Sequence, residues 1–232
     1  MRKIITVDGL AGSGKTTLAR LLASRISFIH LNSGLLYRGL GWLALNLRVA
    51  PDAEQDAYLK ILANYSLSLV VDEHGVSRIK IGKELRGDEL FEPRISDIAS
   101  RIAPFEGVRE QLLAAQREAF PGHPIVAEGR DMGTVVFPAA PLKFFIVAEA
   151  STRASRRLAQ LIAQRGEITA HEKQKIERDL ELEIVERDRR DKTRLVSPTV
   201  PATDAIELDN SSKTLTEMVE AMYSAASSRG LV

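Results

Sequence analysis

The sequence contains no cysteine, so disulfides and thiolate metal sites are excluded. Its four histidines, His30, His74, His123 and His171, are widely spaced and lack metal-ligand spacing, so we expect them at the surface or in loops. No apolar run approaches the ~20 residues of a membrane span. The first apolar run, residues 4–7, is too short for a signal peptide. We therefore expect a cytoplasmic protein without a membrane partner.

The net charge is also small. The 232 residues carry a formal net charge of only +1, with 44% hydrophobic and 27% charged residues. This is ordinary globular composition, and it lacks the strongly basic balance of proteins that bind nucleic-acid polymers. Any anion site must therefore be a local cluster, and we expect no nucleic-acid partner.

Short apolar runs alternate with segments of helical periodicity along most of the chain. The runs predict buried strands at 3–7, 28–31, 125–127, 142–147 and 205–208. Helices are predicted at about 15–27, 35–48, 93–103, 106–119 and 214–226. This alternation indicates an α/β fold with a five-stranded parallel sheet and a ligand site at the carboxyl ends of its strands.

Two segments interrupt the alternation. Residues 66–71 and 76–81 alternate around a turn at 72–75, which predicts an antiparallel hairpin within an inserted lobe, preceded by one more helix. Residues 151–194 contain 12 Lys/Arg and 9 Asp/Glu, a net charge of +3, and indicate two amphipathic helices.

A glycine-rich loop follows the first predicted strand. Residues 9–16 read GLAGSGKT and fit G-x-x-x-x-G-K-[ST] between a strand and a helix. In such a loop backbone N–H groups and the helix dipole face the phosphates of a nucleoside triphosphate. Lys15 is expected to contact the β- and γ-phosphates, and the Thr16 hydroxyl is the expected Mg²⁺ ligand. The loop predicts nucleoside triphosphate binding but by itself says nothing about an acceptor.

Three further clusters contain arginine. They are residues 32–38 (NSGLLYR), 128–138 (EGRDMGTVVFP) and 186–194 (ERDRRDKTR). The first two follow predicted strands, where a parallel sheet binds its ligands. In the third, Arg187, Asp191 and Arg194 share one helix face. Arginine pairs bidentately with phosphate, so together the clusters indicate a second phosphate site.

At these residues the sequence resembles the bacterial cytidylate kinases, from the phosphate loop through 129–138 to 186–194. The resemblance implies a P-loop kinase fold that uses ATP and Mg²⁺ to phosphorylate CMP or dCMP. It also implies a monomer with a core (1–34, 122–150 and 195–232), a monophosphate-binding lobe (about 35–121) and a helical lid (about 151–194). The hairpin at 66–81 matches the enlarged lobe of that family.

The resemblance also implies residue roles. Implied ATP-binding residues are Gly9, Leu10, Ala11, Gly12, Ser13, Gly14, Lys15, Thr16 and Thr17. Implied CMP-binding residues are Ser33, Tyr37, Arg38, Ser100, Arg109, Arg130, Asp131, Arg187, Asp191 and Arg194. The implied catalytic residues are Lys15, Arg130, Arg187, Arg153 and Arg157. Lys15 and the lid candidates Arg153 and Arg157 would neutralise the transferring group, while Arg130 and Arg187, with Arg38, would orient the acceptor phosphate. Within the CMP set, Ser100, Arg109 and Asp131 would contact cytosine.

The Asp131 carboxylate also fits cytosine chemically, because it can accept a hydrogen bond from the N4 amino group and would repel the oxygen of uracil. Glu128 is a candidate second-shell Mg²⁺ contact or, equally, part of a structural salt bridge. The sequence departs from the family pattern at Asn32, where Asp is usual, and at Leu10, where Pro is common.

Other functions remain alternatives at this stage. The acceptor could be UMP or another small molecule such as shikimate. A GTPase switch lacks support, since no Asn-Lys-x-Asp motif is present and the Asp72–Gly75 segment fits a hairpin turn. A non-catalytic nucleotide-binding module would not need Lys15, Thr16 and the arginines together.

Replacement of Lys15 by Ala is expected to lower turnover by several orders of magnitude, because the phosphates would lose their point charge. Steady-state ADP release with saturating substrates measures the effect. A near-wild-type rate would contradict a phosphoryl-transfer role for this loop.

Overall fold

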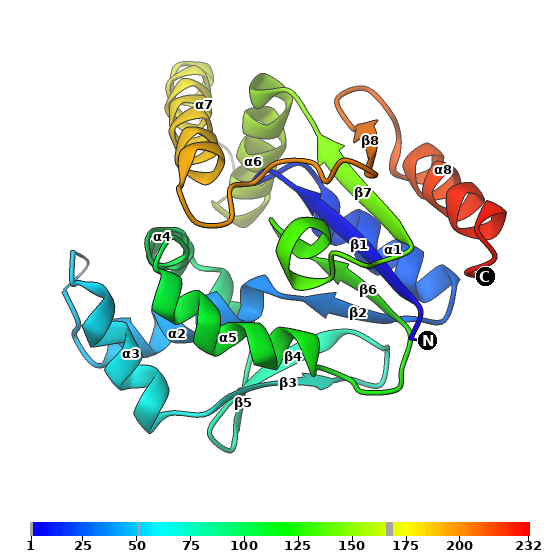
Figure 1. Ribbon diagram of the computed structural model, residues 1–232. Helices are drawn as coiled ribbons and strands as arrows, with labels where there is room; N and C mark the ends of the chain where they lie inside the picture. The colour runs from blue at the N-terminus through cyan, green and yellow to red at the C-terminus, as the bar shows by residue number, and fades with distance from the viewer. Residues whose placement is uncertain (1, 51, 166–168) are drawn as a thin grey trace.

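The computed structural model describes residues 2–50, 52–165 and 169–232 (Figure 1). At its centre lies a five-stranded sheet in which all pairings are parallel. The strand order is β2 (Ile29–Asn32), β6 (Ile125–Glu128), β1 (Ile4–Gly9), β7 (Leu142–Val147) and β8 (Ile206–Asp209). The predicted parallel sheet is therefore confirmed.

Eight α-helices are present in the described part of the chain. They are α1 (Lys15–Arg25), α2 (Gly34–Asn46), α3 (Gln55–Asn64), α4 (Pro93–Ile102), α5 (Glu106–Arg117), α6 (Ala150–Arg165), α7 (Ala170–Thr193) and α8 (Leu215–Ser228). Helices α7 and α8 each begin with a capping box, formed by Thr169 with Glu172 and by Thr214 with Glu217. Each box satisfies backbone N–H groups that the first helical turn leaves unpaired.

The central sheet packs on both faces. On one face α1 and α8 bury Leu22 and Met222 against strand residues such as Val7 and Phe144. The other face is covered in part by the π-helical turn η2 (Met132–Val136), which follows β6. Burial on both faces explains why the strands read as continuous apolar runs.

A separate lobe with its own core lies beside β2 (Figure 1). It contains α2 to α5, a short 3₁₀ helix η1 (Asp88–Phe91) and a three-stranded antiparallel sheet of β3 (Leu67–Val71), β4 (Ser77–Ile81) and β5 (Glu84–Arg86). The predicted hairpin is confirmed as β3 and β4, whereas β5 was not predicted. The lobe joins the central sheet where the N–H of His30 donates to the Gly75 carbonyl at 2.9 Å.

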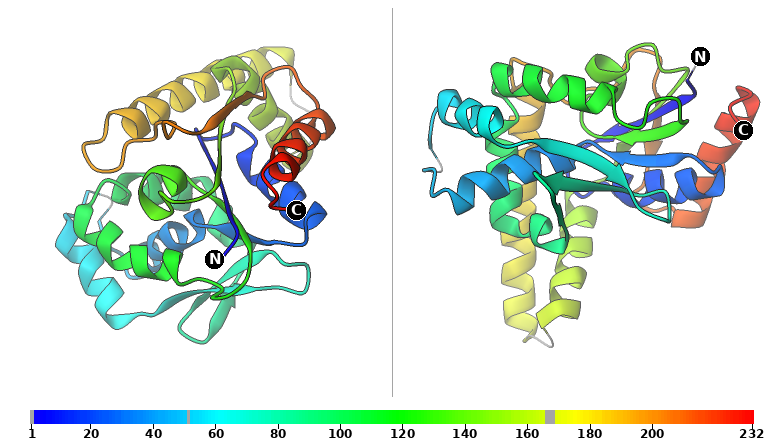
Figure 2. Two further views of the ribbon diagram at one scale, coloured as in Figure 1. Left: turned by 45° about the vertical axis from the view of Figure 1, so that its right-hand side comes forward. Right: turned by 90° about the horizontal axis from the view of Figure 1, so that it is seen from below.

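Helices α6 and α7 pack against each other and project from the body as a long hairpin, most clearly in the right-hand view of Figure 2. Their far ends flank residues outside the described ranges. In the described ranges, no helix combines the length and the apolar character needed to cross a membrane.

Gly9 is the position at which the fold most strictly requires glycine. Its φ is +150°, and a Cβ there would lie 2.3 Å from the Ile146 carbonyl oxygen of β7. Gly82 also has a positive φ of +61°, but a Cβ there would meet nothing within 4 Å. A substitution at Gly82 therefore causes backbone strain alone, whereas one at Gly9 causes backbone strain and steric overlap together.

Gly9→Ala is expected to destabilise the protein by about 2–6 kcal/mol, the sum of backbone strain and overpacking. Gly82→Ala should cost only about 1–2 kcal/mol. Urea unfolding at fixed pH measures both. Equal losses in the two variants would contradict the steric argument.

Candidate active site

The phosphate loop joins the carboxyl end of β1 to the first turn of α1, as the sequence predicted. Gly12 and Gly14 adopt positive φ angles of 74° and 89°. These angles turn the backbone so that the loop wraps toward the start of α1, where unpaired N–H groups and the helix dipole attract anions. The loop therefore has the local geometry of a phosphate site.

Lys15 is the cation of this loop, and it is only 7% exposed. Its ammonium donates to the Leu10 carbonyl at 3.3 Å. Burial, followed by the positive charge of Arg130, lowers the Lys15 pKa to about 7, and Arg187 adds to the effect while Glu128 opposes it. A polyanion at the loop would reverse this shift by favouring the ammonium.

Thr16 and Glu128 meet beneath the loop. The Thr16 hydroxyl donates to Glu128 Oε2 at 2.9 Å, and Glu128 is 2% exposed at the end of β6. Burial alone would raise the Glu128 pKa, but His30, Lys15 and Thr16 together hold it below its ordinary value. An ionised carboxylate beside a hydroxyl is an oxygen donor set that suits Mg²⁺.

His30 corrects one expectation. We expected the histidines at the surface or in loops, but His30 lies in β2 and is 2% exposed. Its Nε2 lies 3.7 Å from Glu128 Oε1. The expectation was wrong for His30 because it lies within a strand of the central sheet, where its side chain lies beside the buried Glu128 and Val76 bridges to its backbone.

Arg38, Arg130 and Arg187 converge from α2, the segment after β6, and α7. Burial, and next the charges of Arg187 and Arg130, lower the Arg38 pKa to about 10. Burial, and next the charge of Arg130, lower the Arg187 pKa to about 10. Like charges held together in a partly buried place indicate an anion-binding site.

The donors of these arginines are only partly used. Arg130 pairs with Asp191 at 3.0 Å, and Arg38 donates to the Leu90 carbonyl at 3.0 Å and the Ser96 hydroxyl at 2.5 Å. Arg187 Nε is buried and has no hydrogen-bond partner among the described residues. Donors therefore remain available for an anion.

A second group of predicted residues lies beside this cluster. Arg109 from α5 forms an ion pair with Asp131, and both side chains are largely buried. The Arg109 guanidinium lies 6.0 Å from the centre of the Tyr37 ring. The Ser100 hydroxyl on α4 is buried without a hydrogen-bond partner in the described chain. These side chains offer hydrogen bonds of both kinds beside an aromatic ring, as a nucleobase requires.

Arg194 reaches the same group through the segment after α7. Its Nε donates to the Ser197 carbonyl at 2.5 Å, and Arg109 Nε donates to the Ser197 hydroxyl at 3.1 Å. Ser197 has a φ of +50°, which is uncommon for serine. The sequence analysis did not identify Ser197, and only its adjacency to Arg194 pointed to it.

The two lid arginines differ in their surroundings. Arg153 is 4% exposed and makes a bidentate ion pair with Asp188 of α7 while also donating to the Ala11 carbonyl at 2.9 Å. It therefore ties α6 and α7 to the phosphate loop. Arg157 is half-buried, and its charge helps to lower the Arg38 pKa, so it faces the arginine cluster.

The two departures from the family pattern have clear local structures. Asn32 Oδ1 accepts from the Gly34 N–H at 3.0 Å, a bond that an aspartate could also accept. The Ser33 hydroxyl donates to the Glu128 carbonyl at 2.8 Å, so it fixes the two strand ends to each other. Leu10 is buried, and its carbonyl accepts the Lys15 ammonium.

Asn210, after β8, also supports the loop and was not identified from the sequence. Its side-chain amide donates to the Ser13 carbonyl at 2.8 Å, and the backbone carbonyl of Asn210 accepts from Arg156 at 2.6 Å. A lone asparagine in a loop gives no sequence signal for such a contact.

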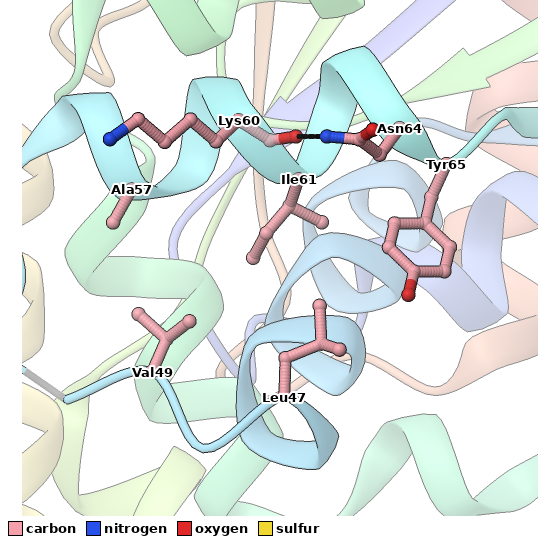
Figure 3. Close-up of a pocket in the computed structure, with 7 residues that line it drawn as sticks. All are labelled: Leu47, Val49, Ala57, Lys60, Ile61, Asn64 and Tyr65. Carbon is pink, nitrogen blue, oxygen red and sulfur yellow. Dashed lines mark hydrogen bonds between the residues drawn. The ribbon is translucent and has the colours of Figure 1, made fainter.

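A hollow elsewhere on the molecule does not belong to this site. It lies between the end of α2 and α3 and is lined mainly by apolar side chains, among them Leu47, Ile61 and Tyr65 (Figure 3). None of the predicted site residues lines it.

The sheet, the phosphate loop and the facing arginines together define a P-loop phosphotransferase. Comparison with known proteins agrees with this class. The family model described as cytidylate kinase matches residues 5–228. The chain therefore belongs to the cytidylate kinase family.

Individual relatives are similar over almost their full lengths. A protein named cytidylate kinase from Vibrio parahaemolyticus is 42% identical over 219 residues, which cover 94% of this chain and 92% of the relative. One of the same name from Stutzerimonas stutzeri is 38% identical and covers 98% and 96% of the two chains.

The lowered Lys15 pKa predicts proton uptake when ATP binds. At pH 8 most Lys15 is neutral in the free protein, because its pKa is about 7. The phosphates favour the ammonium, so binding raises the pKa, and affinity should fall as the pH rises from 7 to 9. Calorimetry at pH 8 in two buffers of different ionisation enthalpy measures the uptake.

Lys15→Met is the control for this experiment, and it should bind ATP without the Lys15-dependent proton uptake. Equal uptake in wild type and variant would contradict the assignment to Lys15.

Proposed function

We propose that this chain transfers the γ-phosphoryl group of ATP to CMP or dCMP, giving CDP or dCDP and ADP. The observation that carries the proposal is that Arg130 and Arg187 lie close enough both to Lys15 of the phosphate loop and to Arg38 to lower, after burial, the pKa of each. Two phosphate sites that face each other suit direct transfer between nucleotides. The family membership supports the same reaction.

On the donor side, residues Gly9 to Thr17 hold the ATP phosphates. Lys15 places its charge on the β- and γ-phosphates, which favour the ammonium that burial disfavours. The Thr16 hydroxyl and the Glu128 carboxylate would hold Mg²⁺ directly or through water. When bound, Mg²⁺ supplies positive charge that neutralises the phosphates.

On the acceptor side, Arg38, Arg130, Arg187 and Arg194 grip the CMP phosphate, and Asp191 contacts the ribose. An oxygen of this phosphate attacks the γ-phosphorus in line, and the bond to the β,γ-bridging oxygen breaks so that ADP leaves with the electron pair. The attacking oxygen is already anionic at pH 7, so no strong base is required. Catalysis is then positioning and charge stabilisation.

Asp131, Arg109 and Ser100 recognise the base in this proposal, with Tyr37 and Ser33 lining the acceptor site. Asp131 accepts a hydrogen bond from the cytosine amino group, while the buried Ser100 hydroxyl supplies a donor or an acceptor. Uracil presents an oxygen to Asp131 and is disfavoured by repulsion.

We also propose that the core, the monophosphate-binding lobe and the lid act as three parts within the boundaries given above. Closure of the lid would bring Arg157 to the transferring group and exclude water, which would otherwise hydrolyse ATP. Arg153 acts at the base of the lid, through Asp188 and the Ala11 carbonyl. We expect a cytoplasmic monomer.

A panel of acceptors with MgATP tests the proposal. We expect CMP or dCMP to give the highest kcat/KM, above UMP, AMP and shikimate, measured as ADP release. A preference for any other acceptor would overturn the substrate assignment.

Asp131→Asn should lower the preference for CMP over UMP by about 10- to 100-fold, since an amide can donate to the uracil oxygen. Asp204→Asn is the matched control, because Asp204 pairs with Lys143 and is 55% exposed in its side chain, away from the proposed base contacts. An unchanged preference in Asp131→Asn would contradict the role of Asp131.

A further inference from the structure

Asp8 is a buried carboxylate that the reaction described above does not use. It lies near the end of β1, directly before Gly9 of the phosphate loop, and is 4% exposed. Its Oδ1 accepts from the Met132 N–H at 2.8 Å, and its Oδ2 accepts from the Gly133 N–H at 2.7 Å. Each carboxylate oxygen thus accepts a hydrogen bond from one of two consecutive backbone N–H groups at the start of η2.

The neighbouring residue of β1 holds the other end of the same segment. The Gly129 N–H donates to the Val7 carbonyl at 3.1 Å. Between these anchor points lie only Arg130 and Asp131. The two residues that are proposed to grip the phosphate and the base therefore form a short loop with both ends bonded to Val7 and Asp8.

The backbone within this loop is also constrained. The Asp131 carbonyl accepts from the N–H groups of Val135 at 2.9 Å and Val136 at 3.1 Å, which closes the π-helical turn. The bonds to Asp8 therefore fix the start of this turn. The orientation of the turn in space in turn determines where the Arg130 and Asp131 side chains point.

We propose that Asp8 is a positioning residue for the acceptor site: its carboxylate fixes the turn after Asp131 and thereby orients Arg130 and Asp131. The proposal rests on the proposed function for the identity of the acceptor. Burial raises the Asp8 pKa to about 7, while the amide bonds from Gly133 and Met132 and the charge of Lys15 oppose this rise and Asp131 adds to it. A buried carboxylate is costly unless hydrogen bonds satisfy it, so its presence here indicates a specific role.

The position of Asp8 predicts which substrate is affected. Its backbone is paired with Phe145 of β7, and the β6 ladder reaches the preceding residue Val7, so the strand pairing supports the phosphate loop independently of the Asp8 side chain. Only the side chain of Asp8 reaches the segment after Arg130 and Asp131, the two-residue loop that we call the acceptor loop. Loss of the carboxylate should therefore impair the acceptor site far more than the ATP site.

Asp8→Asn tests this role, because asparagine has the same shape but only one accepting oxygen, so one of the two amides loses its partner. We expect KM for the acceptor to rise at least about 10-fold with a lower kcat, and KM for ATP to change less than about two-fold. Unchanged acceptor kinetics, or equal rises in both KM values, would overturn the proposal.

Thr6→Val is the matched control. Thr6 lies on the same strand two residues earlier, is fully buried, and its hydroxyl has no hydrogen-bond partner among the described residues. This variant should retain wild-type values of both KM. A loss of acceptor affinity equal to that of Asp8→Asn would assign the effect to general disturbance of β1 and overturn the proposal.

Gly133→Ala disturbs the contact between the Gly133 N–H and the Asp8 carboxylate from the side of the turn. It is the variant to measure if Asp8→Asn does not fold. A Cβ at Gly133 would lie 2.9 Å from the Thr6 hydroxyl and 3.4 Å from Asp8 Oδ2, so the turn must shift. The same selective rise in acceptor KM is expected, and its absence would contradict the proposal.

All variants are assayed with whichever acceptor the wild-type protein uses best. If that acceptor is not CMP or dCMP, the substrate assignment fails while the role of Asp8 is still decided by the ratio of the two KM values.

Discussion

Repulsion among buried positive charges is the constraint on which the site depends. Lys15, Arg38, Arg130 and Arg187 come from segments far apart in the chain. Burial, and next the positive charges of Arg130 and Arg187, lower the pKa values of Lys15 and Arg38, and burial followed by the charge of Arg130 lowers the pKa of Arg187. Folding brings these groups together at a cost, and nucleotide phosphates relieve it. Binding of the substrate phosphates therefore removes an unfavourable electrostatic interaction that folding created, and a preorganised anion site gains affinity in this way.

The fold holds these charges in place by bonding backbone to buried polar side chains. Asp8 bonds the acceptor loop to β1, Ser33 bonds the end of β2 to the end of β6, and Asn210 bonds β8 to the phosphate loop. The first two contacts join the carboxyl ends of neighbouring strands, and the third reaches from the end of β8 to the loop after β1, with β7 between them. Because these polar groups are buried, their hydrogen bonds are directional and costly to break, so the edge of the sheet behaves as a rigid platform.

The sequence predicted the features that have local signals. The phosphate loop was recognisable because glycines and Lys15 stand between a strand and a helix, and the central strands because apolar runs are buried on both faces. Strand β5 was not predicted, since three residues without alternation become a strand only by pairing with β4. Asp8 and Asn210 act through partners far along the chain, and so does the Ser197 hydroxyl through Arg109, which spacing cannot reveal. His30 was misjudged because it belongs to a strand of the central sheet and lies beside Glu128 of β6, a contact that its position in the sequence does not reveal.

Helix α7 has 24 residues and so extends roughly 36 Å. Near its C-terminal end, Asp188 is fixed through Arg153 to the Ala11 carbonyl of the phosphate loop. Asp188 lies about 27 Å along the helix from Ala170 at its far end, so a tilt of about 10° at Asp188 would move that end by about 5 Å. A small rotation at the place where Arg153 joins Asp188 to the phosphate loop would therefore give a larger displacement at the far end of α7.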